Sequence, residues 1–327
     1  MLQYVLRRIL IIIPTLIVIT MISFIIIELP PGDYLTQYVA TLKAQGDMVS
    51  EQQVARLEER YGLDQPIYVR YWKWIWGVLH GDFGYSMEWQ APVSELIGER
   101  LALTFVVSLS TLIFSWMISF PVGVLSATRQ YSVFDYAATF FGFLGLGIPN
   151  FLLALVLMYV SFAYFGASVG GLFSDEYVSA PWSVARVVDM LKHLWIPLIV
   201  LGTSGTARLI RIMRANLLDE LHKPYVRTAR AKGLKERKVI WKYPVRVALN
   251  PFISTVGWTL PTLVSGTTIT AIVLSLPTTG PLLVRALTSQ DMYMAGSFLL
   301  MLSTLTVIGT LLSDILLAWA DPRIRYG

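Results

Sequence analysis

The stretch LALTFVVSLSTLIFSWMISFPVGVLSAT, residues 101–128, contains no charged side chain and ends directly before Arg129. A helix needs about 20 consecutive apolar residues to cross the hydrocarbon core of a bilayer, so this run is long enough to span a membrane. The composition agrees, since 55% of the residues are hydrophobic, 14% are charged and the mean hydropathy is +0.60. Soluble proteins average about 25% charged residues, so the composition argues against a soluble fold.

Similar runs occur along the whole chain and predict an all-α integral membrane protein with six transmembrane helices. The expected spans cover residues 9–27, 101–128, 136–165, 193–212, 247–276 and 292–320. Basic residues flank the ends that this topology places in the cytoplasm, among them Arg7 and Arg8 before the first span and Arg129 after the second. Because cytoplasmic loops carry an excess of Lys and Arg, we expect a multi-pass membrane protein with both termini inside.

The third run is longer than one span and contains residues that disturb a straight helix. Gly142, Gly145, Gly147 and Pro149 interrupt it, which predicts a kinked helix, or one packed through small residues, that ends near Phe165. Between the first two spans the chain is polar and of mixed charge. We therefore predict three parts: an anchor and first helix at 1–30, an extracytoplasmic subdomain at 31–100, and a five-helix core at 101–327.

The most basic stretch of the chain is the loop at residues 213–246, together with the end of the helix before it. Its cationic side chains are Arg208, Arg211, Arg214, Lys223, Arg227, Arg230, Lys232, Lys235, Arg237, Lys238, Lys242 and Arg246. Pro224 and Gly233 predict a short helix, because Pro favours the first helical position and Gly the position after the end. Ala229 and Ala231 would allow a partner to approach closely, with Tyr225 and Val226 as anchors. Equally, the basic residues could simply fix the topology or contact anionic lipid.

Several kinds of chemistry find no support in the sequence. The chain has no phosphate-binding G-x-x-x-x-G-K-[ST] loop, no H-E-x-x-H motif and no G-x-S-x-G motif, so we expect no catalytic residues and no cofactor of its own. It has no Cys, and His80, His193 and His222 lack the spacing of metal ligands. The basic residues concentrate beside apolar segments, which argues against a nucleic-acid partner. The spans also lack the central ionisable residues of an ion-coupled transporter, so the energy for transport should come from elsewhere.

The loop resembles the coupling-helix signature of ABC importer permeases, in the form of the dipeptide/oligopeptide type. The match consists of YVRTARAKGL at 225–234 with ALNP at 248–251. Further similar segments are YVLRRI at 4–9, PGD at 31–33, YGLDQP at 61–66, GDFGYS at 81–86 and DPRIRY at 321–326. The resemblance covers nearly the whole chain and implies the type I importer permease fold. The residues that it implies for contact with an ATPase are Tyr225, Val226, Arg227, Thr228, Ala229, Arg230, Ala231, Lys232 and Gly233.

The same resemblance implies an assembly. Its partners would be a second homologous permease subunit, two cytoplasmic ATPase subunits that bind ATP and Mg, an extracytoplasmic solute-binding protein, and membrane lipid. Ala229 and Gly233 are expected to be the least replaceable positions of the coupling helix. A secondary transporter or channel that acts without ATPase partners is the alternative function.

The solute is less well defined than the assembly. Peptide permeases of this type carry an acidic segment before a Pro-Gly-Leu-Gly turn, where this chain has AIVLSLPTTGPL at 271–282. This variant is similar to a branch thought to serve oligosaccharides, so peptides and oligosaccharides both stay open. Irregular backbone in a membrane usually lines a cavity, although small residues also serve helix packing. The expected lining residues of the translocation path are Gly145, Gly147, Asn150, Ser265, Gly266, Thr267 and Thr268.

Overall fold

The computed structural model describes residues 2–28, 64–166, 170–255 and 268–320, together with the single residues 35, 39, 54, 56 and 59. The described chain is mostly helical and forms two compact units. The first unit comprises Phe105–Pro277 and Thr306–Gly327, and the second comprises Leu2–Thr104 and Thr278–Leu305. The long helices α5 (Val93–Thr128) and α16 (Met292–Ala320) contribute to both units.

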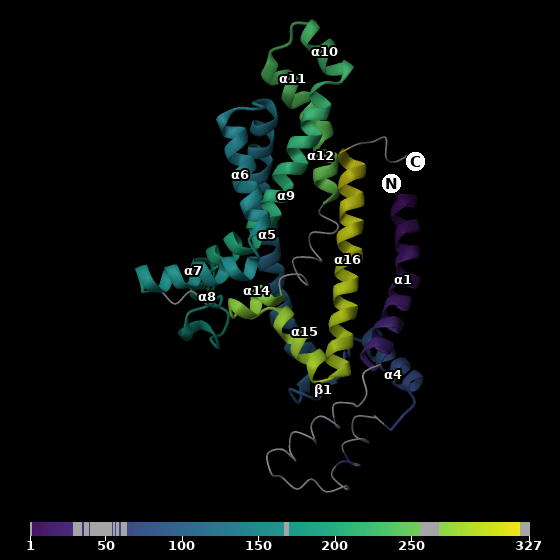
Figure 1. The fold of residues 1–327 in the computed structure, drawn as a ribbon. Helices are drawn as coiled ribbons and strands as arrows, with labels where there is room; N and C mark the ends of the chain where they lie inside the picture. The colour runs from purple at the N-terminus through teal and green to yellow at the C-terminus, as the bar shows by residue number, and fades with distance from the viewer. Residues whose placement is uncertain are drawn as a thin grey trace. The chain divides into compact units, whose positions relative to one another are not determined.

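The first unit is built around α9, which runs through Trp195–Leu221. Its other elements are α6 (Val133–Gly147), α7 (Asn150–Phe165), the short 3-10 helix η1 (Asp175–Tyr177), α8 (Val184–His193), α10 (Pro224–Ala231), α11 (Glu236–Lys242), α12 (Pro244–Ser254) and α14 (Thr268–Val273). Helices α6, α7 and α12 all pack against α9 (Figure 1). Helices α10 and α11 lie at the end of α9 away from α8 (Figure 1).

One apolar cluster holds α9 against its neighbours. Met213 and Leu217 of α9 are fully buried with Phe252 of α12, and Trp116 of α5 meets Phe252 edge to face at 4.7 Å between ring centroids. Close approach depends on a glycine here, because a Cβ on Gly123 would lie 2.7 Å from Met213 Cβ. The part of the first unit around Met213 and Phe252 is therefore a packed helix bundle.

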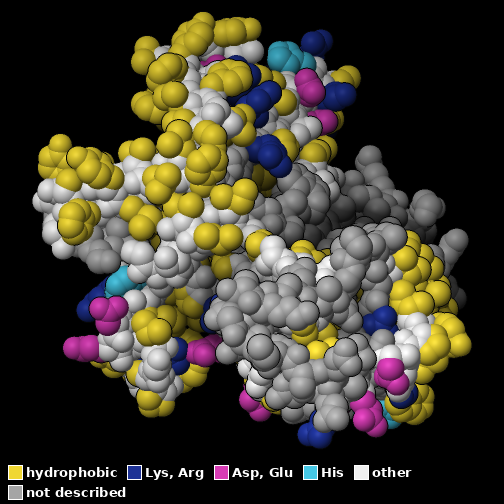
Figure 2. All heavy atoms as spheres, turned by 60° about the horizontal axis from the view of Figure 1, so that its bottom comes forward, with side chains coloured by type: hydrophobic (Ala, Val, Ile, Leu, Met, Phe, Trp, Pro, Cys, Tyr) yellow, Lys and Arg dark blue, Asp and Glu magenta, His cyan; other side chains and the backbone are white. Residues whose placement is uncertain are grey.

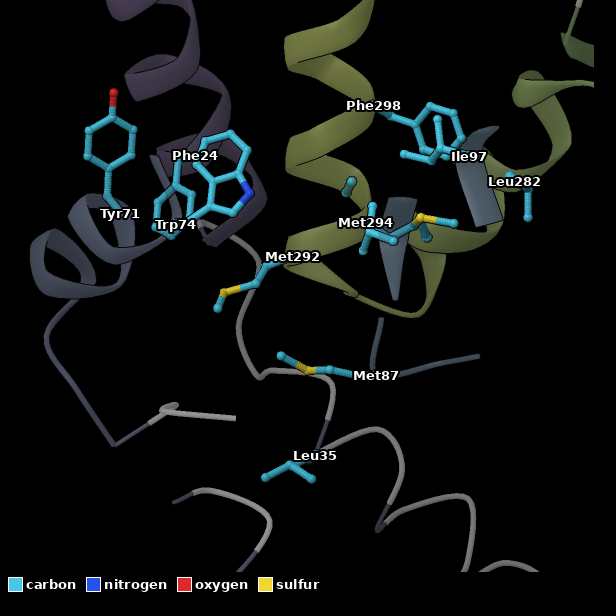
Figure 3. Packing of buried hydrophobic residues seen from close by; sticks show 13 residues of the cluster. Phe24, Leu35, Tyr71, Trp74, Met87, Ile97, Leu282, Met292, Met294 and Phe298 are labelled. Atoms are coloured by element: carbon cyan, nitrogen blue, oxygen red, sulfur yellow. The ribbon is translucent and has the colours of Figure 1, made fainter. Parts of the chain in front are cut away.

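The second unit contains α1 (Leu2–Glu28), α4 (Ile67–Leu79), the antiparallel strands β1 (Tyr85–Ser86) and β2 (Ala91–Pro92), α15 (Thr279–Thr288) and the first part of α16. Its core is rich in aromatic and Met side chains (Figure 3). Phe24 of α1 stacks on Trp74 of α4, with 5.8 Å between the ring centroids, while Phe298 of α16 is fully buried. The hydroxyl of Tyr71 is 2.9 Å from Thr20 Oγ1, which adds a polar contact between α1 and α4.

The spans expected from the sequence are found in part. Within the described residues, three helices are long and apolar enough to cross a membrane: Val93–Thr128, Trp195–Leu221 and Met292–Leu311. Helices α6 and α7 count as a fourth if the bent pair is one span. Helix α1 contains the shorter apolar segment Ile13–Ile25, and the expected fifth span includes residues 256–267, which lie outside the described residues. Six spans and the predicted orientation thus stay a prediction.

The predicted break in the third run is confirmed. Helix α6 ends at Gly147, α7 begins at Asn150, and the two axes differ by 99°. Helix α7 ends at Phe165, as expected, with Gly166 in the left-handed conformation at φ +59°. The side chains of α7 are apolar and largely exposed, and its surface in Figure 2 is yellow and white.

The boundary predicted at residue 100 falls inside α5, because the helix begins at Val93 and continues without a break to Thr128. The predicted helix at residues 50–60 of the extracytoplasmic subdomain lies mostly outside the described residues. The division into three parts at residues 30 and 100 stays a prediction.

Candidate functional site

The candidate coupling helix α10 has the sequence-coded ends that were expected. Pro224 occupies its first turn, where a missing N–H disturbs no helical hydrogen bond. At the other end the N–H of Lys232 donates to Thr228 O at 3.1 Å, and that of Gly233 donates to Arg230 O at 2.9 Å. Gly233 has φ +72°, a conformation that favours glycine, so the predicted stop of the helix is confirmed.

Helices α10 and α11 form a small core of their own. Val226 is fully buried and Ala229 is 4% exposed, and both pack with Val239 of α11. Leu234 and Tyr243 cover this cluster from the side. Val226 was expected to be a docking anchor and Ala229 a point of close approach, but neither side chain is on the free surface. Both side chains hold α10 against α11.

The exposed face of α10 is therefore made by other residues of the signature. It comprises Pro224, Arg227, Thr228 and Ala231, which follow helical spacing, and Lys232 and Gly233 are exposed just beyond the end. The Arg230 guanidinium binds the Glu236 carboxylate, with Nη2 2.7 Å from Oε1, and joins α10 to α11. This hydrogen bond lowers the pKa of Glu236 and raises that of Arg230, so the pair is charged at neutral pH.

Tyr225 connects α10 back to α9. Its hydroxyl donates a hydrogen bond to the Glu220 carboxylate. Burial and this neighbouring carboxylate raise the pKa of Tyr225 above its ordinary value, so the hydroxyl keeps its proton at neutral pH. Together with the short connection through His222 and Lys223, this bond limits the freedom of α10 relative to α9.

An ion pair joins α9 to α6 in the same unit, about two helical turns before the end of α9. Arg214 of α9 binds Asp135 of α6, whose side chain is only 3% exposed. Asp135 also accepts hydrogen bonds from Ser126 Oγ and from the N–H of Tyr131. In the sequence Arg214 is one of many basic residues that indicate topology, and Asp135 has no pattern of its own, although Ser132 as an N-cap residue before it marks a helix start.

The structure describes four of the residues expected along the translocation path, namely Gly145, Gly147, Asn150 and Thr268, and their role there stays a prediction. Gly145 is buried against Thr203 of α9, where an added Cβ would lie 2.9 Å from Thr203 Cγ2, so this glycine serves helix packing. A Cβ on Gly147 would have no neighbour within 4 Å. Asn150 is the half-buried first residue of α7 and Thr268 the half-buried first residue of α14. Ser265, Gly266 and Thr267 lie outside the described residues.

A second polar network lies in the other unit, and the sequence analysis did not find it. Asp291, at the start of α16, is fully buried and accepts hydrogen bonds from Ser86 Oγ at 2.6 Å and from the N–H of Glu88 at 3.1 Å. Beside it, Arg285 Nη2 lies 2.7 Å from Glu88 Oε1. These contacts hold the turn between β1 and β2 against α15 and against the residue Asp291, which connects α15 to α16. Their partners are about two hundred residues apart, a distance at which sequence patterns carry no pairing information.

Two family models match the chain. Residues 119–326 match the binding-protein-dependent transport system inner membrane component, and residues 1–110 match the N-terminal region of such membrane components. Together the two matches include α1, α9 and the candidate coupling helix α10.

Similar proteins extend over the full length. The chain is 40% identical over 328 residues to the oligopeptide transport system permease protein AppB of Bacillus subtilis, covering 100% of both chains. It is 33% identical over 342 residues to the dipeptide transport system permease protein DppB of Escherichia coli K12, covering 100% of this chain and 99% of DppB. A solved structure of the inward-facing MetNI methionine ABC transporter has a similar fold, with a TM-score of 0.50 and 16% identity over 69% of this chain and 96% of that one.

Proposed function

The chain belongs to the family of inner membrane components of binding-protein-dependent transport systems, and from this membership we propose that it is a permease subunit of an ATP-driven peptide importer. Its relatives over the full length are named as oligopeptide and dipeptide permeases, which supports peptides as the solute class. It would form half of the translocation pathway in the bacterial inner membrane. It would carry no ATPase activity of its own, and ATP and Mg would bind to separate ATPase subunits.

The observation that carries this proposal is the build of α10. The helix is short, its ends are defined by Pro224 and Gly233, and its inner face is fixed by its own core with α11. That arrangement leaves a stiff outer face at Arg227, Thr228 and Ala231, which is small enough at Ala231 to enter a cleft. We infer that this face docks on an ATPase subunit. Rigid elements lose little conformational entropy on binding, so they suit a contact that must transmit force.

Helix α9 supplies the path from the docking face to the membrane. It continues unbroken from Trp195 to Leu221, and α10 follows it directly. Movement of α10 would therefore displace α9, and through Arg214 and Asp135 it would displace α6 as well. In this mechanism ATP binding favours one arrangement of the assembly and hydrolysis favours another, and the permease follows as a population shift.

The proposed assembly contains this chain, a second homologous permease subunit, two cytoplasmic ATPase subunits and an extracytoplasmic solute-binding protein. The family description itself names dependence on a binding protein. Oligosaccharide is the second candidate for the solute, because residues 271–282 lack the acidic residue of most peptide permeases. Leu274 and Leu276 in this segment are buried, so their part in solute selection would be indirect.

Purification of the complex tests the proposal. The chain is co-expressed with its genomic neighbours, purified, and placed in lipid, and ATP hydrolysis is measured with and without the binding protein. We expect one second permease and ATPase subunits to co-purify, with hydrolysis stimulated by loaded binding protein. A chain that purifies alone and transports solute without ATP would instead be a secondary transporter or channel.

A matched pair of variants tests the docking face. Ala231→Tyr should weaken ATPase association, because it adds a ring to the face proposed to enter the cleft. Ala185→Tyr makes the same change at an exposed alanine of α8 and should leave association intact. Equal association of both variants with the ATPase would place the docking surface elsewhere.

A further inference from the structure

Helix α8 buries two charged side chains and exposes a stripe of apolar ones, which is the reverse of an amphipathic helix in water. One stripe, at helical spacing, contains Arg186 and Asp189, which are 4% and 9% exposed, and the apolar Met190 beside them is 6% exposed. The opposite stripe is apolar and turned outward: Val184 (83% exposed), Val187 (38%), Val188 (44%) and Leu191 (57%). Exposed tryptophans stand on either side of the helix, Trp182 before it and Trp195 after it. A solvated helix would show the reverse distribution.

The buried charges have partners, which explains why this orientation is held. The Arg186 guanidinium carbon lies 4.6 Å from the ring centroid of Phe173 and 4.4 Å from that of Trp182. Asp189 accepts hydrogen bonds from the N–H and the hydroxyl of Ser174, at 2.7 and 2.6 Å. These contacts fold the preceding segment over the polar stripe. The apolar stripe is left on the outside and cannot turn inward without breaking them.

The length of α9 places α8 at the level of the bilayer. The first charged residue of α9 is Arg208, so its uncharged part begins at Trp195 and ends at Ala207. At 1.5 Å per residue this part is about 20 Å long, and any tilt shortens its reach along the bilayer normal. The hydrocarbon core is about 30 Å thick. An uncharged part this short cannot carry Trp195 beyond the bilayer, so Trp195 and the preceding α8 lie no further out than the boundary of the hydrocarbon core.

We propose that α8 lies in the membrane interface at the N-terminal end of α9 and that its apolar stripe, Val184, Val187, Val188 and Leu191, is covered by lipid acyl chains. The stripe is continuous with the exposed Trp195 at the start of the α9 span. Trp182 and Trp195 lie where tryptophan is favoured, at the boundary between headgroups and acyl chains. Lys192, which is exposed near the end of α8, can extend to a lipid phosphate.

This placement gives α8 a mechanical role. It would hold the outer end of α9 at a fixed depth while the inner end follows α10. Because the apolar stripe continues into the α9 span, lipid is the partner that it favours. If a second permease or a binding protein covers this face instead, the test below will show it. The inference rests on the proposed function as a membrane permease.

Fluorescence quenching tests the proposal directly, because the chain contains no Cys and single-Cys variants carry one label each. Val188→Cys is labelled with an environment-sensitive dye in the full chain, assembled with its partners in vesicles of phosphatidylcholine. Quenchers are phosphatidylcholines brominated at defined chain positions, and aqueous iodide. Met117→Cys in the α5 span (72% exposed) is the lipid control, and Glu176→Cys in the exposed loop is the water control.

We expect bromolipid to quench the Val188 label severalfold more strongly than the Glu176 label. The strongest quenching should come from bromines near the top of the acyl chain, since interfacial helices bury their apolar face by about 5–10 Å. If iodide quenches the Val188 label as strongly as the Glu176 label, the apolar stripe faces water and the proposal is wrong. If neither iodide nor bromolipid quenches the Val188 label, a protein partner covers the stripe and the proposal is also wrong. If the Met117 label also escapes bromolipid, the membrane function itself is wrong rather than the placement of α8.

A label at Leu191→Cys repeats the measurement one helical turn away on the same stripe. The two labels should report the same shallow depth if α8 lies parallel to the membrane. A steep difference in depth between them would overturn the interfacial placement.

Discussion

The guanidinium of Arg214 on α9 holds the carboxylate of Asp135 on α6 through two hydrogen bonds, from Nε to Oδ1 at 2.7 Å and from Nη2 to Oδ2 at 2.8 Å. The same carboxylate accepts from Ser126 of α5 and from the N–H of Tyr131 at 2.9 Å. One acidic group thus connects three helices near the end of α9 that precedes α10. Bidentate pairs of this kind fix geometry as well as charge.

Loss of Arg214 should therefore be destabilising. Arg214→Ala leaves the buried Asp135 without its cation but with its bonds to Ser126 and Tyr131, and the expected loss is about 1–3 kcal/mol in the free energy of unfolding, the cost of a buried polar group that loses a partner. Thermal unfolding of the detergent-purified chain measures this. Arg227→Ala, at an exposed position of α10, is the control and should change stability by less than about 0.5 kcal/mol. Equal stability of the two variants would mean that Asp135 does not depend on the pair.

The turn at Gly233 gives a prediction about backbone strain alone. With φ +72° and no atom within 4 Å of an added Cβ, Gly233→Ala should cost about 1–2 kcal/mol through the left-handed conformation. Gly98→Ala in the helix α5 also meets no atom within 4 Å, but should stabilise by about 0.5–1 kcal/mol because alanine favours a helix. Amide hydrogen exchange in α10 and α5 measures both. Gly233→Ala is expected to lower the free energy of unfolding and Gly98→Ala to raise it, and a change in the same direction in both variants would contradict the explanation by backbone conformation.

Ala229 and Ala231 separate internal packing from docking. Ala229→Leu overfills the cluster with Val226 and Val239 and should destabilise the α10–α11 pair by about 1–3 kcal/mol. Ala231→Leu adds the same side chain to the exposed face and should leave the pair folded while it weakens ATPase association. Proteolysis of the loop and co-purification of the ATPase report the two effects. A loop that is equally protected in both variants would show that Ala229 is not packed inside.

The Arg230–Glu236 pair should matter less than the pair at Asp135. Both side chains are well exposed, at 42% and 55%, so Glu236→Gln should cost no more than about 1 kcal/mol. The pKa of Glu236 is lowered in the folded loop, so its contribution is present above the ordinary glutamate value of about 4.3 and is lost as the pH falls through the lowered value. Hydrogen exchange of α10 in wild type and Glu236→Gln should therefore converge in acid. A gap that widens below pH of about 4 would have the wrong sign.

Local signals in the sequence predicted the ends of elements, and packing decided the rest. Pro224 and Gly233 fix the ends of α10, and Pro149 with its neighbouring glycines marks the bend after α6, because each acts on its own backbone. The Arg214–Asp135 contact joins residues 79 positions apart, which no local pattern encodes. The helix α8 was not predicted from the sequence, and the spacing of Arg186 and Asp189 would not have shown which face is buried, since the period is the same in both orientations. Small residues are ambiguous in the same way, as Gly145 and Gly147 show.

Gly145 and Gly147 were both expected along the translocation path, and a paired substitution separates packing from lining. A Cβ at Gly145 would lie 2.9 Å from Thr203 Cγ2 and 3.4 Å from Thr203 O. Thr203 cannot rotate away freely, because its hydroxyl donates to Ile199 O one turn earlier. Gly145→Ala should therefore force α6 from α9 and cost about 1–3 kcal/mol. Gly147→Ala meets nothing within 4 Å and should be tolerated.

A compensating change sharpens this prediction. Thr203→Ser removes the methyl group that meets the new Cβ and keeps the hydroxyl bonded to Ile199, so it should restore much of the stability lost in Gly145→Ala. Contacting residues show such coupling in double-mutant cycles, at about 0.5–3 kcal/mol. Thermal unfolding of the four variants gives the coupling, and solute uptake in vesicles gives the function. If Gly145→Ala keeps wild-type stability but loses uptake that Thr203→Ser does not restore, Gly145 lines the path and the packing interpretation is wrong.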